Sequence, residues 1–179
     1  PNKYKYKASP NDDPAYKTGK PDAETYKRLQ LYLVHLFTTI GAPQIWNGEE
    51  MGMWGADDPH PRKPLWWKEF TFEPETRNNF QPGSSETDPV GFNQQQFDWY
   101  KKLCSIRNSN AVLSTGNIEF LKAEGKTLAY KRFDGSNEII VLFNLENETK
   151  SFSLPANARY SDLLTGKKVK ASTVELGAL

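Results

Sequence analysis

The sequence predicts a mixed α+β protein in which helices come first and an antiparallel β domain follows. Two segments within the first 110 residues repeat apolar side chains at the spacing of amphipathic helices. From residue 111 onward, six alternating or β-branched segments follow one another at about ten-residue spacing, each closed by Gly, Asn or Pro. We therefore expect two domains, residues 1–110 and residues 111–179, the second an all-β Greek-key sandwich.

The composition is that of a globular protein, with 37% hydrophobic and 13% aromatic residues in 179. A net charge of +1 gives no overall field that would attract nucleic acid or an anionic membrane. The longest apolar-rich run, LQLYLVHLFTTI, is shorter than the roughly 18 residues that a membrane span needs. The single cysteine, Cys104, excludes an internal disulfide framework.

The first predicted helix follows Asp22, which is a good helix-starting residue, and has the sequence AETYKRLQLYLVHLFTTI. Gly41 ends it. Residues 42–46, APQIW, then read as a short buried strand, and Asn47-Gly48 is a strong turn signal. A helix, a short break and an apolar strand make up half of a βαβ repeat.

The segment from Glu49 to Val90 shows no sustained hydrophobic period. About forty residues without regular structure are uncommon in a compact domain and tend to be functional. The second predicted helix has the sequence NQQQFDWYKKLCSIRNSN and an apolar face that includes Cys104. In the β half, the segments FDGSN and NLENET are the tightest hairpin candidates.

Two ordered motifs resemble the last third of glycoside hydrolase family 13, the α-amylase family, and especially its neopullulanase, cyclomaltodextrinase and α-glucosidase-like members. The family motif Gly-x-Pro-x-Ile-Tyr-Tyr-Gly-x-Glu is matched here by Gly41, Pro43, Ile45, Gly48 and Glu50. The motif Asp-Pro-x-x-Arg-x-Pro-Met-x-Trp is matched by Asp58, Pro59, Arg62, Pro64 and Trp67. The departures are Trp46-Asn47 for Tyr-Tyr and Leu65 for Met.

This resemblance implies that residues 1–110 are the closing segment of a (β/α)₈ barrel, with helix 7, strand 8, a long loop and helix 8. An antiparallel β-sandwich C-terminal domain would follow. The parent enzyme would hydrolyse α-glucans by a retaining mechanism. Starch, malto-oligosaccharides, pullulan and cyclodextrins stay open as its substrates.

The resemblance also places residues 47–67 on the rim of a sugar cleft, because barrel active sites are built from the loops after the strands. Trp rings would stack on sugar faces, while Asp, Asn and Arg would hydrogen-bond hydroxyl groups. In PLWW at least one Trp must pack inward to hold the loop, and Arg62 would pin it by a bond to Asp58. The candidate substrate-binding residues are Asn47, Glu50, Trp54, Asp58, Arg62, Trp66 and Trp67.

We expect no catalytic residue in this chain. Retaining glycosidases use two carboxyl groups about 5–5.5 Å apart. The adjacent Glu49 and Glu50 would point to opposite sides of an extended backbone, as would Asp57 and Asp58. The catalytic carboxylates of the resembled family lie on segments that precede the region matched here, so the chain alone should be inactive.

No spacing of acidic residues resembles a calcium-binding loop, so we expect no metal or other cofactor. A Ca²⁺ site of the parent enzyme would lie outside this chain. The expected partner is an α-glucan oligosaccharide or polysaccharide, with no nucleic acid and no membrane span. An unpaired strand 8 would also favour self-association of the chain.

The alternative is a non-catalytic carbohydrate-binding or structural β-domain module. Residues 113–179 contain no Trp and only Tyr130 and Tyr160 as tyrosines, which is little for a sugar platform. A binding module needs an exposed planar aromatic pair, whereas a packing domain needs an apolar patch. The compartment is left open, although an extracytoplasmic, bacterial-type enzyme is favoured.

Overall fold

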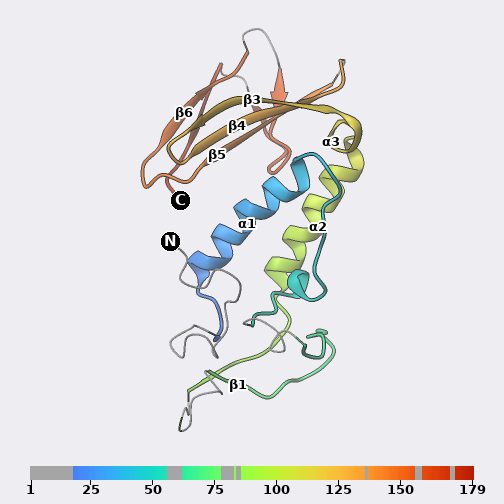
Figure 1. The fold of residues 1–179 in the computed structure, drawn as a ribbon, viewed down its shortest axis with the longest axis vertical. Helices are drawn as coiled ribbons and strands as arrows, with labels where there is room; N and C mark the ends of the chain where they lie inside the picture. Colours follow the sequence, from blue (N-terminus) through green and yellow to red (C-terminus); the bar gives the residue numbers. More distant parts are fainter. Residues whose placement is uncertain are drawn as a thin grey trace. The chain divides into compact units, whose positions relative to one another are not determined.

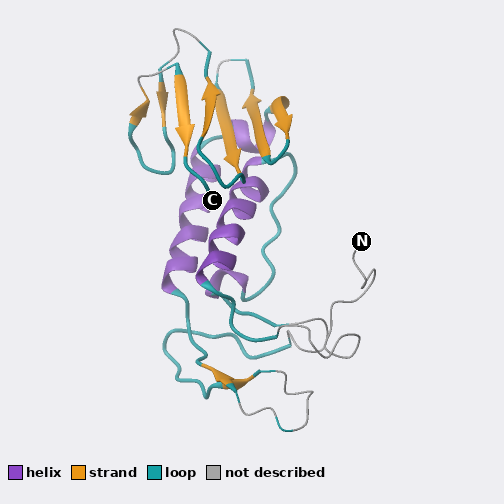
Figure 2. Cartoon of the chain, turned by 90° about the vertical axis from the view of Figure 1, so that its left-hand side faces the viewer, coloured by secondary structure: helices purple, strands orange, loops and turns teal. Residues whose placement is uncertain are grey.

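A computed structural model describes residues 18–55, 62–77, 83, 86–135, 137–155, 159–169 and 172–179. These residues form a mixture of helices and sheets, and all their strand pairs are antiparallel (Figures 1 and 2). The predicted α+β class is therefore confirmed. Contacts group the chain into two compact units, one of residues 1–27 and 45–99 and one of residues 28–44 and 100–179. The domain division at residue 110 stays a prediction.

Both predicted long helices are confirmed, and the first begins after the predicted starting residue. Helix α1 (Ala23–Thr38) begins after Asp22, whose Oδ1 accepts the Thr25 N–H at 2.7 Å. Helix α2 (Gln94–Ser109) begins after Asn93, whose Oδ1 accepts the Gln96 N–H at 3.1 Å. Two short helices were not predicted, the 3₁₀ helix η1 (Glu49–Met51) and α3 (Val112–Thr115).

The predicted strand at residues 42–46 is not formed, and these residues are irregular. A strand is stabilised by hydrogen bonds to a neighbouring strand, and the described part of the chain offers this segment none. The side chains of Ile45 and Trp46 are consequently 39% and 64% exposed. Self-association stays a prediction, and it now rests on these exposed side chains rather than on a strand edge.

Each of the six predicted β segments contains strand structure. Strands β3 (Asn117–Glu124), β4 (Thr127–Phe133) and β5 (Glu138–Asn144) form one sheet in that order. Two further pairs complete the second unit, β6 (Lys150–Ser153) with β9 (Thr173–Leu176) and β7 (Tyr160–Ser161) with β8 (Lys168–Val169).

One of the two predicted hairpins forms and the other does not. The FDGSN segment joins the paired strands β4 and β5, but NLENET joins β5 to β6, whose partner is β9. The Asn144 side chain explains the difference, because its amide donates to the backbone oxygens of Glu148, Leu176 and Gly177 at 2.8, 3.0 and 2.8 Å. These bonds tie the turn to the end of β9 instead of letting β6 return along β5.

The core of the second unit lies where the end of α1 meets the sheet (Figure 1). Tyr130 is fully buried, and its hydroxyl lies 2.6 Å from Thr38 Oγ1 and 3.3 Å from His35 Nδ1. Burial raises the pKa of Tyr130. His35 is partly buried and packs edge to face against Tyr130 and Phe143, so it belongs to this core. The cluster around Tyr130 also contains Val34, Ile118, Leu128, Ile139, Val141 and Phe143.

Two buried arginines hold the C-terminal end of α1. Arg132, only 1% exposed, donates from Nη1 to the backbone oxygens of Thr38 and Thr39 at 2.7 and 2.8 Å. Arg107, 8% exposed, donates to those of Phe37 and Gly41 at 2.7 and 2.6 Å. The last carbonyl groups of a helix lack partners within it and carry partial negative charge, so both cations are well placed. Burial and the nearby Arg107 lower the pKa of Arg132.

The first unit contains two short paired strands, β1 (Glu75–Thr76) and β2 (Thr87–Asp88). An ion pair between Arg77 and Asp88 holds them together. Arg77 Nε and Nη2 donate to the two carboxylate oxygens of Asp88 at 2.7 and 2.6 Å. The Lys20 N–H donates to the same carboxylate at 2.9 Å. Asp88 is 4% exposed. Its hydrogen bonds join its own segment to those of Lys20 and Arg77.

We expect the first unit to lose stability in acid through Asp88. The hydrogen bonds from Arg77 lower the pKa of Asp88, so its contribution is complete above the pKa of about 3.9 of an unfolded Asp and is lost as pH falls through the lower folded pKa. Asp88→Asn should weaken the unit at neutral pH and flatten this acid dependence. Urea unfolding followed by Trp fluorescence between pH 2 and 7, against wild type, measures both effects; an unchanged acid dependence would contradict the assignment.

Candidate functional site

The candidate site lies in the loop after residue 45, whose first feature is a tight turn. Trp46 O accepts the Glu49 N–H at 3.0 Å, and Gly48 has φ 100° and ψ −15°. Positive φ at the third residue is a property of type II and type I′ β-turns, and both favour Gly there. Gly48 is also closely packed, since an added Cβ would lie 2.4 Å from Met53 Sδ. The turn therefore has no room for a side chain at Gly48.

The two glutamates of the turn are occupied by its backbone. Glu49 Oε2 accepts the Trp46 N–H at 3.2 Å, and Glu50 Oε2 accepts the Gly48 N–H at 3.0 Å. Glu50 is half-buried, and its hydrogen bond stabilises the turn at Gly48. Each carboxylate thus has a local structural role, and the geometry gives no indication of an acid and nucleophile pair.

Beyond the turn, Trp54, Trp66 and Lys63 contact one another and hold the loop together. The rings of Trp54 and Trp66 pack edge to face with centroids 4.3 Å apart, and they are only 9% and 3% exposed. Lys63 Nζ donates to Trp54 O at 3.0 Å and to Glu75 Oε2 at 2.7 Å, and lies 5.7 Å from the centroid of the Trp66 ring. This pair therefore supports the loop from inside.

Other aromatic side chains of the first unit point to solvent. Trp67, the neighbour of Trp66, is 47% exposed, and Phe70 is 64% exposed. Trp46 is 64% exposed at the start of the turn. Sequence reasoning missed Trp46 because it assigned the residue to a buried strand. The replacement of the family's Tyr-Tyr by Trp46-Asn47 was the signal that could have identified it.

The remaining predicted site residues lie apart from the buried pair. Asn47 and Arg62 are exposed. Asp58 lies outside the described residues, so its bond to Arg62 stays a prediction. The structure thus brings Trp54 and Trp66 together in the interior and places Asn47, Arg62 and Trp67 at the surface, where they can reach a ligand.

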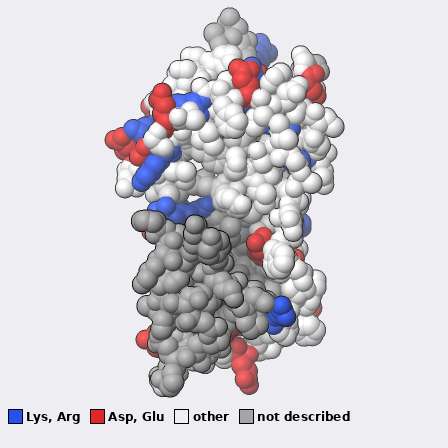
Figure 3. Space-filling view, viewed as in Figure 1, with Lys and Arg blue, Asp and Glu red and all other residues white. Residues whose placement is uncertain are grey.

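The described residues contain no group of three His, Cys, Asp or Glu side chains arranged to hold a metal ion. In the same part of the chain, no helix is long and apolar enough to cross a membrane. Acidic and basic side chains lie near one another over the second unit in Figure 3, so the described residues visible there gather no patch of a single sign.

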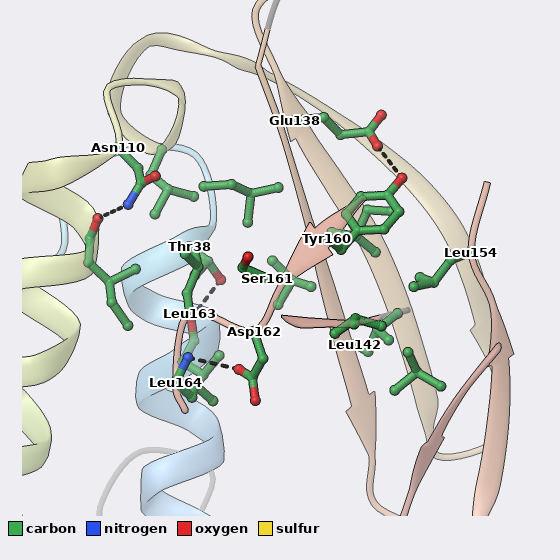
Figure 4. Close-up of a pocket in the computed structure, with 18 of the residues that line it drawn as sticks. Thr38, Asn110, Glu138, Leu142, Leu154, Tyr160, Ser161, Asp162, Leu163 and Leu164 are labelled. Carbon is green, nitrogen blue, oxygen red and sulfur yellow. Dashed lines mark hydrogen bonds between the residues drawn. The ribbon is translucent and has the colours of Figure 1, made fainter. Parts of the chain in front are cut away.

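The second unit contains a cavity of about 490 Å³ between its helices and its strands (Figure 4). Its lining is mostly aliphatic, with Leu142, Leu154 and Leu163 among the side chains drawn. At one side the Tyr160 hydroxyl donates to Glu138 Oε1 at 2.9 Å, and burial together with Glu138 raises the pKa of Tyr160 to about 12. Sugars bind flat aromatic faces and arrays of polar groups, so this lining does not resemble a glycan site.

The strands of the second unit give little support to a separate carbohydrate-binding module. Tyr130 is buried, Tyr160 is bonded to Glu138, and Phe120 is 60% exposed on β3. Among the described residues of these strands, no second exposed aromatic ring accompanies Phe120. The planar exposed pair that a sugar platform needs is therefore not seen there.

No family model matches the chain. A cyclomaltodextrinase from Thermoanaerobacter pseudethanolicus is 33% identical over 145 residues, which are 81% of this chain and 22% of that protein. A cyclomaltodextrinase from Geobacillus thermopakistaniensis is 27% identical over 155 residues, 84% of this chain and 23% of that protein.

A solved structure named cyclomaltodextrinase superimposes with a TM-score of 0.62 at 26% identity, covering 86% of this chain and 24% of that one. The chain thus spans about a quarter of the length of the relatives it matches.

Proposed function

Because the chain corresponds to a C-terminal portion of enzymes of glycoside hydrolase family 13, the α-amylase family, we propose that it serves an α-glucan hydrolase by supplying a glucan-contacting loop and not the catalytic carboxylates. Relatives named cyclomaltodextrinase, neopullulanase and maltogenic α-amylase support this assignment. The substrate class of the whole enzyme would be starch, malto-oligosaccharides, pullulan or cyclodextrins, cleaved with retention.

In that enzyme, α1, the loop and α2 would be the closing segment of a (β/α)₈ barrel, and residues 111–179 a β-sandwich. The order of the elements supports this proposal, because a long helix, an irregular loop and a second long helix precede the strands. Residues 42–46, which are irregular here, would become the eighth strand only beside parallel neighbours, since those supply its hydrogen bonds.

The loop's proposed role rests on one observation: of the adjacent Trp66 and Trp67, the first is buried and the second is exposed. Trp66 is packed against Trp54 in the interior, while Trp67 and Trp46 are exposed. An inward pair fixes the backbone, and the outward rings can then stack on glucose faces without being reorganised. Preorganisation of this kind lowers the entropy lost on binding.

The polar residues of the loop take two different roles in this proposal. The exposed Asn47 and Arg62, together with Asp58 of the same loop, would hydrogen-bond sugar hydroxyl groups. Glu50 would act indirectly, because its carboxylate already accepts the Gly48 N–H. Of the seven candidate substrate-binding residues, Asn47, Asp58 and Arg62 would therefore contact sugar, and Glu50 would position the turn.

The chain alone should bind an α-glucan without hydrolysing it. A retaining reaction needs two free carboxyl groups across the scissile bond, and Glu49 and Glu50 are both bonded to the turn. Isothermal titration with maltoheptaose and β-cyclodextrin, beside a reducing-sugar assay on starch, tests both parts. We expect weak binding and no released sugar; hydrolysis would overturn the proposal, and absent binding would remove the glucan-contacting role from the isolated loop.

A further inference from the structure

The exposed turn carries a chemical liability that the proposed function does not use. Asn47 is followed by Gly48, and an Asn side chain can be attacked by the backbone nitrogen of the next residue when that residue has no side chain to obstruct it. Asn47 is exposed, so water has access to its amide. We propose that Asn47 is a site of spontaneous deamidation whose rate is held down by Glu50.

The reaction needs only water as a co-reactant. The Gly48 nitrogen loses its proton and forms a bond to Asn47 Cγ, the bond from Cγ to the amide nitrogen breaks, and the freed nitrogen leaves as ammonia with the proton it takes up. The cyclic imide then adds water at one of its two carbonyl carbons. Opening one way gives Asp, and opening the other gives isoaspartate, whose side-chain carbon has entered the backbone.

Glu50 opposes the first step because it faces the nitrogen that must ionise. Its Oε2 accepts the Gly48 N–H at 3.0 Å, so loss of that proton would place a second negative charge beside the carboxylate. A neighbouring like charge disfavours the ionised form of an acid and raises its pKa. The population of the reactive nitrogen anion falls accordingly.

The turn geometry opposes the second step. The imide closes only when the Gly48 nitrogen comes within bonding distance of Asn47 Cγ, which requires rotation about the Cα–C bond of Asn47. That rotation would move Gly48, whose carbonyl oxygen accepts the N–H groups of Met51 and Met53, both at 3.1 Å.

The test compares rates of deamidation in the folded chain with peptide mapping by mass spectrometry, which separates Asn, Asp and isoaspartate at position 47. Glu50→Gln keeps the shape and an acceptor oxygen but removes the charge, and we expect deamidation on the order of tenfold faster than wild type. Glu49→Gln is the matched control, since it removes a charge from the same turn at a carboxylate that accepts the Trp46 N–H. It should leave the rate within about twofold of wild type.

A parallel incubation in urea separates the folded geometry from the local sequence. All three chains should deamidate at similar, faster rates when unfolded. The proposal is overturned if Glu50→Gln reacts no faster than wild type in the folded state, if Glu49→Gln accelerates the reaction equally, or if the difference persists in urea. Trp fluorescence spectra of the folded variants show whether the loop has kept its structure.

Deamidation would matter for glucan contact because it adds a negative charge next to Trp46, and isoaspartate also lengthens the backbone of the turn. A lower glucan affinity of aged protein is therefore expected, and this consequence alone rests on the proposed function. The mass-spectrometric readout does not depend on glucan binding, so the two proposals can fail separately.

Discussion

Replacing Arg132 with Met is expected to lower the free energy of unfolding of the second unit by about 3–5 kcal/mol, because several charged hydrogen bonds are lost and their buried acceptors stay unpaired. Arg132 is 1% exposed and donates to the backbone oxygens of Thr38, Thr39, Leu113, Gly116 and Asn117. Met fills a similar volume but supplies no donor. The α1 end, α3 and the start of β3 would lose their shared partner together.

The measurement is urea unfolding followed by far-UV circular dichroism and, separately, by Trp fluorescence. All five Trp residues lie in the first unit, so fluorescence reports that unit while circular dichroism also follows the strands. Lys131→Met on the same strand is the control; its ion pair with Glu119 at 2.9 Å is screened by solvent and should contribute little to stability. Equal losses in the two variants would contradict the role assigned to Arg132.

Replacing Trp66 with Ala is expected to destabilise the first unit by about 3–5 kcal/mol, because truncating a buried Trp leaves a cavity. The ring is 3% exposed and contacts both Trp54 and Lys63. Loss of glucan binding in this variant would follow from loss of the loop, so by itself it says nothing about contact with sugar.

Replacing Trp67 with Ala supplies that separate information. Its ring is 47% exposed, so stability should change by less than about 1 kcal/mol. Affinity for maltoheptaose should fall on the order of tenfold, as expected when about 1.4 kcal/mol of ring contact is lost. Fluorescence-detected urea unfolding and isothermal titration measure the two quantities. The opposite result, a stable Trp66→Ala and an unstable Trp67→Ala, would reverse the inward and outward assignments.

The sequence could not tell which of the adjacent Trp66 and Trp67 packs inward. The segment PLWW required one Trp to pack inward, yet nothing in its spacing distinguished Trp66 from Trp67. The choice depends on where Trp54 lies, and the path of an irregular loop brings it to Trp66 and to the neighbouring Lys63. Roles such as the brace formed by Glu50 depend in the same way on the turn conformation.

The sequence by itself determined the elements whose signals are local. Asp22 and Asn93 cap the two long helices they precede, and alternation with closing Gly or Asn located the six β segments, because capping and alternation act between residues close in sequence. Only the tertiary structure decided what depends on distant partners. Residues 42–46 form no strand without a neighbour to pair with, Asn144 directs β6 to β9, and Arg132 is buried because five distant backbone oxygens surround it. Hydrogen bonds of this kind join residues far apart in the chain, so no local pattern records them.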